Sequence, residues 1–522
     1  MAGLAIAAAA LVAPASLFAS TRVAHAANAC TAQAPGAYPN DPDYSPAENA
    51  SPGATWNDDQ WYLFGCLPPG APLATDPENA SGMSVDKAWA QYSKGNDQVV
   101  VAYMEGGVNW RINSSCELKD QAFLNKGELP LPQNAQGQTK DPQLGGDLYD
   151  INLDGVFNVE DYLHDPRVLS ALVGVPKSPP GGPFLHHVCA ANGGPPGGTD
   201  ITPEDLIVAL GHCQVDQNTH LPVGTTCSGT THSDNDGNGY ANDINGWNFN
   251  RDTNDPQTEQ SKYGHFNGES AQLVAQANNN YRGAGMCPLC RYIPIKAGDE
   301  AIDRPDRVAE AITFAADSGV KVMDATSASL GLTKEVQAAI DYAYHKGMVV
   351  VFASNDFESA DHTDGMYYPH VWPGNSTTGD HSTRGTSLQC PSQLPTLIPG
   401  CQAFYQTNST FRSRSSLTSY GPHALFSVPN NDGSTSTGTP TTAGVAALIA
   451  AEGVNAAGAN GGQLNAEEIR QVARSTASYI GTLPVTCALC FQGLPDGTTK
   501  FNIQYGYGRP NVLLADQAVV QG

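Results

Sequence analysis

Ser436 stands in a run of small hydroxyl and glycine residues that leads directly into an alanine-rich apolar segment. The residues 445–450 have helical apolar spacing, so the sequence predicts a helix that begins close to Ser436. Unpaired backbone N–H groups at a helix start stabilise negative charge. Pro440 suits the first turn, because its missing N–H would have no partner there. Such a serine could act as a nucleophile whose oxyanion faces the helix amides. An ordinary N-cap serine in a Ser/Thr-rich loop is the other interpretation.

The elements that must position this serine alternate between strands and helices. A near-continuous apolar run at 98–104 predicts a buried parallel strand. Glu105 follows it, at the edge where open α/β sheets build their sites. Further strands are predicted at 292–295, 320–323 and 348–352, and helices at 85–92, from Glu269, at 306–318 and at 335–346. This alternation predicts an α/β fold, a three-layer α/β/α sandwich with a mainly parallel sheet.

Four stretches resemble, in chain order, the motifs of the subtilisin-like serine peptidases (subtilases, peptidase family S8). They are the strand with Glu105-Gly106-Gly107, the pair Gly264-His265, the strand 351–356 with Asn355, and 434–440 around Ser436. The stretches 236–249, 416–422 and 507–511 add further similarity, and the resemblance covers roughly residues 55–515.

The resemblance implies acyl transfer on a protein or peptide substrate. Ser436 would attack the carbonyl, His265 would take its proton, and Glu105 would orient the imidazole. Asn355 and a backbone N–H near Ser436 would bind the oxyanion. The chain therefore resembles a secreted serine endopeptidase.

Several residues depart from the family pattern. Glu105 replaces aspartate, so its extra methylene must fold back or push the imidazole. Phe266 places a bulky ring next to the base, and Ser434 replaces the glycine two residues before the nucleophile. A second register would place Asn267, in place of His265, at the base position. The departures leave two hypotheses: a tuned peptidase, or a catalytically impaired pseudo-peptidase that binds peptides or proteins.

Two acidic loops have the ligand spacing of EF-hand-type calcium loops, with oxygen-bearing side chains at positions 1, 3, 5, 9 and 12 and glycine at 6. The first offers Asp150, Asn152, Asp154, Asn158 and Asp161, and the second Asp234, Asp236, Asn238, Asn242 and Asn245. We therefore expect Ca²⁺ as a cofactor, more weakly in the second loop because Asn245 supplies no carboxylate. Solvated acidic turns are the alternative. A calcium-dependent adhesion or docking module would explain the first loop but not the His, Asn and Ser stretches.

The chain is expected to divide into four parts. Residues 1–26 predict a secretory signal peptide, with a membrane anchor as the rival interpretation. Residues 27–84 read as an N-terminal wrapping segment and 85–520 as the peptidase domain. Within that domain, 112–232 break the α/β rhythm and form an insertion that carries the first acidic loop.

Composition limits the partners and the compartment. The net charge of −25 disfavours nucleic acid and anionic membrane surfaces. The 12 cysteines include two C-x-x-C pairs, Cys287/Cys290 and Cys487/Cys490, and Cys390 and Cys401 bracket a loop. Disulfides are the default in an exported chain, while zinc held by the two C-x-x-C pairs is the alternative. We expect a secreted, disulfide-bonded monomer that does not bind membranes once the signal is removed.

Overall fold

The computed structural model describes most of the predicted peptidase domain and parts of the segment before it. The described residues are 30, 38–44, 60–67, 80–110, 112–172, 201–211, 234–260, 263–299, 302–326, 331–354, 356, 364–378, 413–415, 417–430, 433–457, 463–478, 480, 501 and 505–522. The predicted signal segment 1–26, Asn355, Cys390, Cys401 and the pair Cys487/Cys490 lie outside them.

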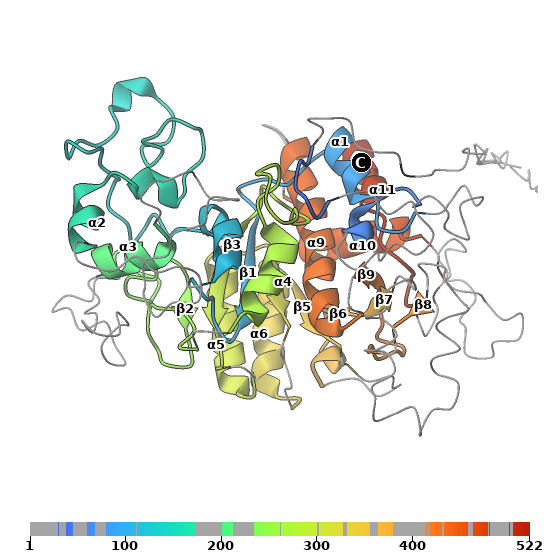
Figure 1. The fold of residues 1–522 in the computed structure, drawn as a ribbon. Coiled ribbons are helices and arrows are strands. Elements are labelled where there is room, and N and C mark those ends of the chain that lie inside the picture. The colour runs from blue at the N-terminus through green and yellow to red at the C-terminus, as the bar shows by residue number, and fades with distance from the viewer. Residues whose placement is uncertain are drawn as a thin grey trace, which may run out of the picture.

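Six parallel strands form the central sheet, in the order β2-β3-β1-β4-β5-β6 (Figure 1). The strands are β1 (Val100–Glu105), β2 (Trp247–Asn248), β3 (Arg291–Lys296), β4 (Val322–Ala325), β5 (Val349–Ala353) and β6 (Val371–Gly374). β1 lies inside the sheet, between β3 and β4, so its carboxyl end opens onto the middle of one sheet edge. The predicted α/β fold with a mainly parallel sheet is confirmed.

Helices cover both faces of this sheet (Figure 1). They are α1 (Val85–Gln91), α4 (His265–Val274), α5 (Pro305–Asp317), α6 (Lys334–His345), α9 (Thr435–Ala457), α10 (Ala466–Thr476) and α11 (Val512–Gln521). Alternate residues of β1 point to opposite faces, as the period of a strand requires. Val101 and Tyr103 pack in one core with α4 and α9, whereas Ala102 and Met104 pack in another with α5 and α6. The sheet therefore lies between two layers of helices, which gives the three-layer α/β/α arrangement.

Smaller elements complete the fold. A three-stranded sheet has the order β8-β7-β9, with β7 (Ser376–Thr378), β8 (Ser413–Arg414) and β9 (Val428–Asn430). Short 3-10 helices are η1 (Trp61–Leu63), η2 (Asn113–Glu117), η3 (Lys119–Gln121), η4 (Pro142–Leu144), η5 (Val159–Tyr162) and η6 (Asp364–Tyr367). Among the described residues, no helix is long and apolar enough to cross a bilayer.

The region that interrupts the α/β rhythm has a small core of its own. It contains α2 (Pro166–Ala171) and α3 (Pro203–Leu210), which lie beyond the β2–β3 side of the sheet in Figure 1. Its buried apolar cluster includes Tyr162, Leu206 and also Ile244. The cluster thus joins the predicted insertion to the loop that carries the second acidic motif. The boundaries 27–84, 85–520 and 112–232 themselves stay predictions.

One helix begins earlier than the sequence predicts. α4 starts at His265, four positions before Glu269. The ring of Phe266 is fully buried and meets the ring of Tyr103 edge to face, with centroids 4.6 Å apart. Asn267 hydrogen-bonds with both backbone groups of Asn109. These tertiary contacts stabilise a first turn that Gly268 makes weak by intrinsic propensity.

Candidate active site

Glu105 ends β1 and is fully buried at the carboxyl edge of the sheet. The two residues after it are glycines for steric reasons. A Cβ at Gly106 would lie 2.6 Å from the carbonyl oxygen of Asp299 and 2.7 Å from the hydroxyl of Tyr263. Gly107 has φ +97°, a conformation that side chains disfavour. The chain can therefore turn sharply away from the sheet and leave the carboxylate at its edge.

His265, at the first position of α4, contacts this carboxylate directly. Its Nδ1 atom faces Oε1 of Glu105, and its side chain remains 43% exposed. Asn267, the residue of the alternative register, is instead fully buried, and its amide bonds with the backbone of Asn109 at 2.8 and 3.0 Å. The structure thus brings His265, and not Asn267, against Glu105. The ring of Phe266 points into the core, so it does not stand over the imidazole.

Glu269 is a second carboxylate at the same imidazole, and it is not among the site residues predicted from the sequence. It lies one helical turn after His265, and its Oε1 is 2.9 Å from Nε2 of the ring. Its Oε2 accepts a hydrogen bond from the hydroxyl of Tyr103. The imidazole therefore lies between two carboxylates, one at each nitrogen. The (i, i+4) spacing of His265 and Glu269 was the signal that could have found it.

Burial and these carboxylates set the protonation of the site. Burial by itself lowers the pKa of His265, but the hydrogen bonds and charges of Glu105 and Glu269 outweigh it and raise that pKa far above its usual value. Burial raises the pKa of Glu269, and the charge of Glu105 adds to this effect. Asp324, on β4, is fully buried; burial and both glutamates raise its pKa well above the ordinary value. This shift favours the neutral form of Asp324.

Ser436 lies in the first turn of α9, as the sequence predicts for a helix start. Asp356, which follows β5, anchors this turn: its Oδ1 accepts from the backbone N–H and from the hydroxyl of Thr435, each at 2.8 Å. α4 and α9 lie side by side (Figure 1), and Gln272 donates to the hydroxyl of Thr441 at 2.6 Å. Both helices therefore begin at the carboxyl edge of the sheet. Asn355 lies outside the described residues.

The first acidic loop folds around its own side chains. The carboxylate of Asp161 accepts from three backbone N–H groups, and Oδ1 of Asp150 is buried with no hydrogen-bond partner. Lys140 lies 3.5 Å from the other oxygen of Asp150. The remaining predicted ligands bond within the loop: Asn152 donates to Asp154, and Asn158 accepts from the N–H of Glu160. The unpaired Oδ1 of Asp150 is a suitable ligand for a bound cation. The ammonium group of Lys140 already balances part of the negative charge of that carboxylate.

The second acidic loop gathers more carboxylates than its own spacing predicts. Ligand oxygens of Glu128, Asp234 and Asp236 lie within 4.8 Å of one another. Asn238 donates to Asp243, and burial raises the pKa of Asp243 to about 7, with Asp236 and Glu128 adding to the shift.

Two predicted ligands of this loop make further contacts through atoms that would not bind the ion. The side-chain NH₂ of Asn245 donates to the carbonyl of Phe123 at 2.7 Å, while its Oδ1 is buried with no hydrogen-bond partner, and the backbone N–H of Asn242 donates to Glu128. Glu128 and Asp243 were missed because one is distant in sequence and the other is outside the motif. Carboxylates that converge in this way fit a hard divalent cation.

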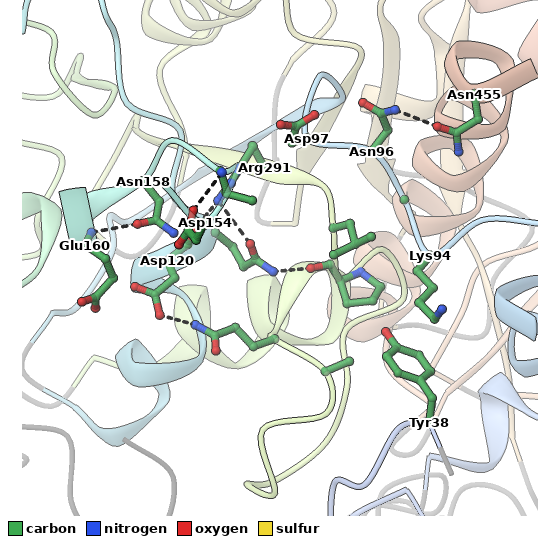
Figure 2. Close-up of a pocket in the computed structure, with 17 residues that line it drawn as sticks. Tyr38, Lys94, Asn96, Asp97, Asp120, Asp154, Asn158, Glu160, Arg291 and Asn455 are labelled. Atoms are coloured by element: carbon green, nitrogen blue, oxygen red, sulfur yellow. Dashed lines mark hydrogen bonds between the residues drawn. The ribbon is translucent and has the colours of Figure 1, made fainter. Parts of the chain in front are cut away.

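A pocket of about 690 Å³ lies at the opposite edge of the sheet (Figure 2). It is lined by Asp97, just before β1, and by Arg291, at the start of β3, so it is distinct from the site at Glu105. Asp154 and Asn158 of the first acidic loop also line it. Burial lowers the pKa of Arg291, while neighbouring carboxylates, including that of Asp154, oppose this shift. After Lys140, Arg291 is thus the second positively charged side chain close to the first acidic loop.

Among the described residues, no cysteine is free. Disulfides join Cys30 to Cys66 and Cys287 to Cys290, the latter one of the C-x-x-C pairs. Both sulfurs of that pair are therefore taken up in a disulfide rather than left as zinc ligands.

Comparison with known proteins points to one group. The model of the subtilase family matches residues 98–508. Thermitase from Thermoactinomyces vulgaris is 30% identical over 220 residues, which cover 41% of this chain and 69% of thermitase. A thermophilic serine proteinase from Bacillus sp. (strain AK1) is 32% identical over 142 residues, 27% of this chain and 34% of that protein. Among solved structures, a protease from Pseudoalteromonas arctica PAMC 21717 aligns over 92% of this chain and 100% of its own, with 16% identity and a TM-score of 0.42.

Proposed function

Because the chain belongs to the subtilase family, we propose that it is a secreted serine endopeptidase with Ser436, His265 and Glu105 as its catalytic residues. The observation that carries the proposal is the contact between Nδ1 of His265 and Glu105 at the carboxyl edge of the sheet. A carboxylate at Nδ1 orients the ring and stabilises its charged form during proton transfer. Protein or peptide chains are the proposed substrates.

Each residue has one step in this reaction. The hydroxyl oxygen of Ser436 attacks the peptide carbonyl, and its proton passes to Nε2 of His265. His265 then gives that proton to the leaving amine, and water repeats the sequence to release the acyl group. Backbone N–H groups at the start of α9, together with the amide of Asn355, are the proposed donors to the oxyanion.

Secretion, a monomeric state and the absence of nucleic-acid and membrane partners are part of the same proposal. Residues 1–26 have the pattern of a signal peptide, and the disulfides at Cys30–Cys66 and Cys287–Cys290 suit an oxidising compartment. The net charge of −25 disfavours polyanionic partners.

The test is covalent labelling with a serine-directed fluorophosphonate. We expect one label per chain, located at Ser436 by peptide mapping, together with cleavage of an unstructured protein substrate. Ser436→Ala should lose both, whereas Ser475→Ala, at an exposed serine of α10, should retain both. Absence of label on the folded wild-type protein, at every pH tried, would overturn the proposal.

A second function is supported by one specific contact. Glu269 lies 2.9 Å from Nε2 of His265, the atom that must receive the serine proton. If that contact is permanent, the protein is a pseudo-peptidase whose cleft binds peptides without cleaving them. An unlabelled Ser436 together with saturable binding of an unstructured peptide would favour this function.

We also propose Ca²⁺ as a structural cofactor. Glu128, Asp234 and Asp236, with Asp243 beside them, would hold it in the second acidic loop, where their oxygens converge. Asp150, Asn152, Asp154, Asn158 and Asp161 would hold a further ion in the first. The ion would neutralise carboxylates that otherwise repel one another and so stabilise the insertion.

A further inference from the structure

Glu269 is placed to control the proposed catalytic base. It lies on the same face of α4 as His265, and its side chain is only 5% exposed. One carboxylate oxygen is 2.9 Å from Nε2 of the imidazole, and the other accepts from the hydroxyl of Tyr103. Because both oxygens have partners on rigid elements, α4 and β1, the carboxylate is fixed rather than loosely tethered.

The other polar groups near the ring come from β1, from β4 and from the residues just after β4 or just before α4. Glu105 on β1 occupies Nδ1, and the hydroxyl of Thr326, after β4, lies 3.3 Å from that carboxylate. Burial and both glutamates raise the pKa of Asp324 on β4, which favours its neutral form. Tyr103 and Tyr263 are neutral as well, since burial and the nearby carboxylates raise their pKa values.

The two carboxylates determine where protons lie on the ring. Burial and the charge of Glu105 raise the pKa of Glu269 to about 7, so the arrangement depends on Glu269 being ionised. An ionised carboxylate only accepts hydrogen bonds, and a ring with such a group at each nitrogen carries a proton on both. His265 is then an imidazolium. An imidazolium has no lone pair at Nε2 and cannot take the proton of Ser436.

We propose that Glu269 is a positioning residue that holds Nε2 of His265 in its protonated form and thereby withholds the base from Ser436 at neutral pH. The inference rests on the proposed peptidase function and adds a means of regulating it. For catalysis the N–H bond at Nε2 must first break, and its proton passes to water as the pH rises. Nε2 then has the lone pair that receives the proton of Ser436, and the number of protons is conserved.

The sign of the pH dependence follows from this order of events. Active enzyme appears as pH rises through the raised pKa of His265, so the rising limb of kcat/KM should lie well above pH 6.5, the ordinary histidine value. Removing the charge of Glu269 should lower that pKa and move the limb toward acid.

The experiment compares pH profiles of kcat/KM for wild type, Glu269→Gln and Glu269→Asp. Glu269→Gln keeps the size of the side chain and removes its charge. We expect its limb to shift by at least one unit toward acid, which gives about tenfold higher kcat/KM below the wild-type midpoint. Glu269→Asp keeps the charge and should leave the limb closer to that of wild type. Glu335→Gln, at an exposed glutamate of α6, should not move it. An unchanged limb in active Glu269→Gln overturns the proposal.

A second measurement separates this proposal from the peptidase assignment. The titration of His265 can be followed by NMR with ¹⁵N-histidine in the Ser436→Ala background, with the signal assigned by its loss in His265→Gln. We expect Glu269→Gln to lower the titration midpoint by at least one pH unit. An unchanged midpoint overturns the role of Glu269 whether or not the enzyme is active. A shifted midpoint with no label on Ser436 at any pH supports that role and refutes the peptidase function instead.

Discussion

Glu105 illustrates how much a single side chain depends on the strand that carries it. As the last residue of β1, it starts from a fixed position, and its carboxylate reaches Nδ1 of His265. Its length is therefore matched to the distance between the strand and α4. The sequence predicts that the longer side chain must fold back or push the imidazole, and in the structure its carboxylate contacts Nδ1 of the ring directly.

Shortening this side chain should accordingly weaken the proposed enzyme. In Glu105→Asp the carboxylate would withdraw by one methylene, and about 1 Å of misplacement can cost on the order of 10²-fold in rate. We expect kcat to fall by about that factor, as measured on an unstructured protein substrate at the optimal pH.

The control for this variant is Glu335→Asp, the same substitution at an exposed position of α6. It should leave kcat unchanged. A rise in kcat of Glu105→Asp would mean that aspartate fits the site better and that the contact with Glu105 is not the productive one.

Among the helices and strands, α4 is the element whose local structure most directly positions a proposed catalytic residue. Its first turn carries His265, and the amide of Asn267 attaches that turn to the backbone of Asn109, beyond β1. The strand end and the helix start are therefore held together by buried polar contacts. The relative placement of Glu105 and His265 depends on them.

Removing the amide of Asn267 should lower the stability of the folded protein without removing a proposed catalytic group. Asn267→Ala leaves the buried N–H and carbonyl of Asn109 without this partner, and a loss of about 1–3 kcal/mol in the free energy of unfolding is expected. Denaturant titration measures it. Gly268→Ala, next in the chain and with open space around its Cβ, should instead stabilise by about 0.5–1 kcal/mol.

Substitutions at His265 and Asn267 test which of these two residues occupies the base position. His265→Ala should abolish cleavage, whereas the fraction of Asn267→Ala that is folded should retain it. The opposite result would place the base outside His265.

The contact between α9 and α11 should make stability depend on pH. Asp516 on α11 is fully buried with neither carboxylate oxygen hydrogen-bonded, and burial with the charge of Glu452 on α9 raises its pKa to about 9. The folded protein then binds a proton that the unfolded chain releases near pH 4. Stability contributed by this group is full at low pH and is lost between about pH 4 and 9.

Asp516→Asn should remove that slope. We expect the melting temperature of the variant, relative to wild type, to be higher at pH 8 than at pH 5 by roughly 2 °C or more. Thermal unfolding at the two pH values measures it. An equal difference at both would show that Asp516 is ionised in the folded protein.

At the scale of the whole molecule, acidic residues link the insertion to the sheet. Glu128 accepts from the backbone of Asn235, Asp236 and Asn242, which draws the second acidic loop onto the core that α3 shares. That loop leads into β2, at one side of the sheet. A cation in the loop would therefore stabilise both parts.

Calcium removal should lower the melting temperature, because an ion that binds only the folded state stabilises it by mass action. We expect Asp236→Asn to lose a larger share of the chelator-induced shift than Asp154→Asn. Several carboxylates converge at Asp236, whereas Lys140 and Arg291 already lie close to the first loop.

Scanning calorimetry with excess Ca²⁺ and with excess chelator measures the shift, and Asp303→Asn, at an exposed position, should leave it intact. Identical melting curves under both conditions would argue against calcium in either loop.

The sequence by itself determined the α/β fold, the strand that ends in Glu105 and the helix start at Ser436. These follow from local patterns: apolar runs for buried strands and small residues before an apolar helix, whose energetics depend on neighbours in the chain. It could also nominate His265 and the acidic loops, because motif spacing is local too.

Only the tertiary structure decided which groups meet. It put His265 rather than Asn267 against Glu105, started α4 four residues early, and added Glu269 to the imidazole. It also brought Glu128, far away in sequence, to Asp236. Contacts between elements depend on how the chain crosses between strands and on burial, which raises the cost of every unpaired charge. No pattern along the chain carries that information.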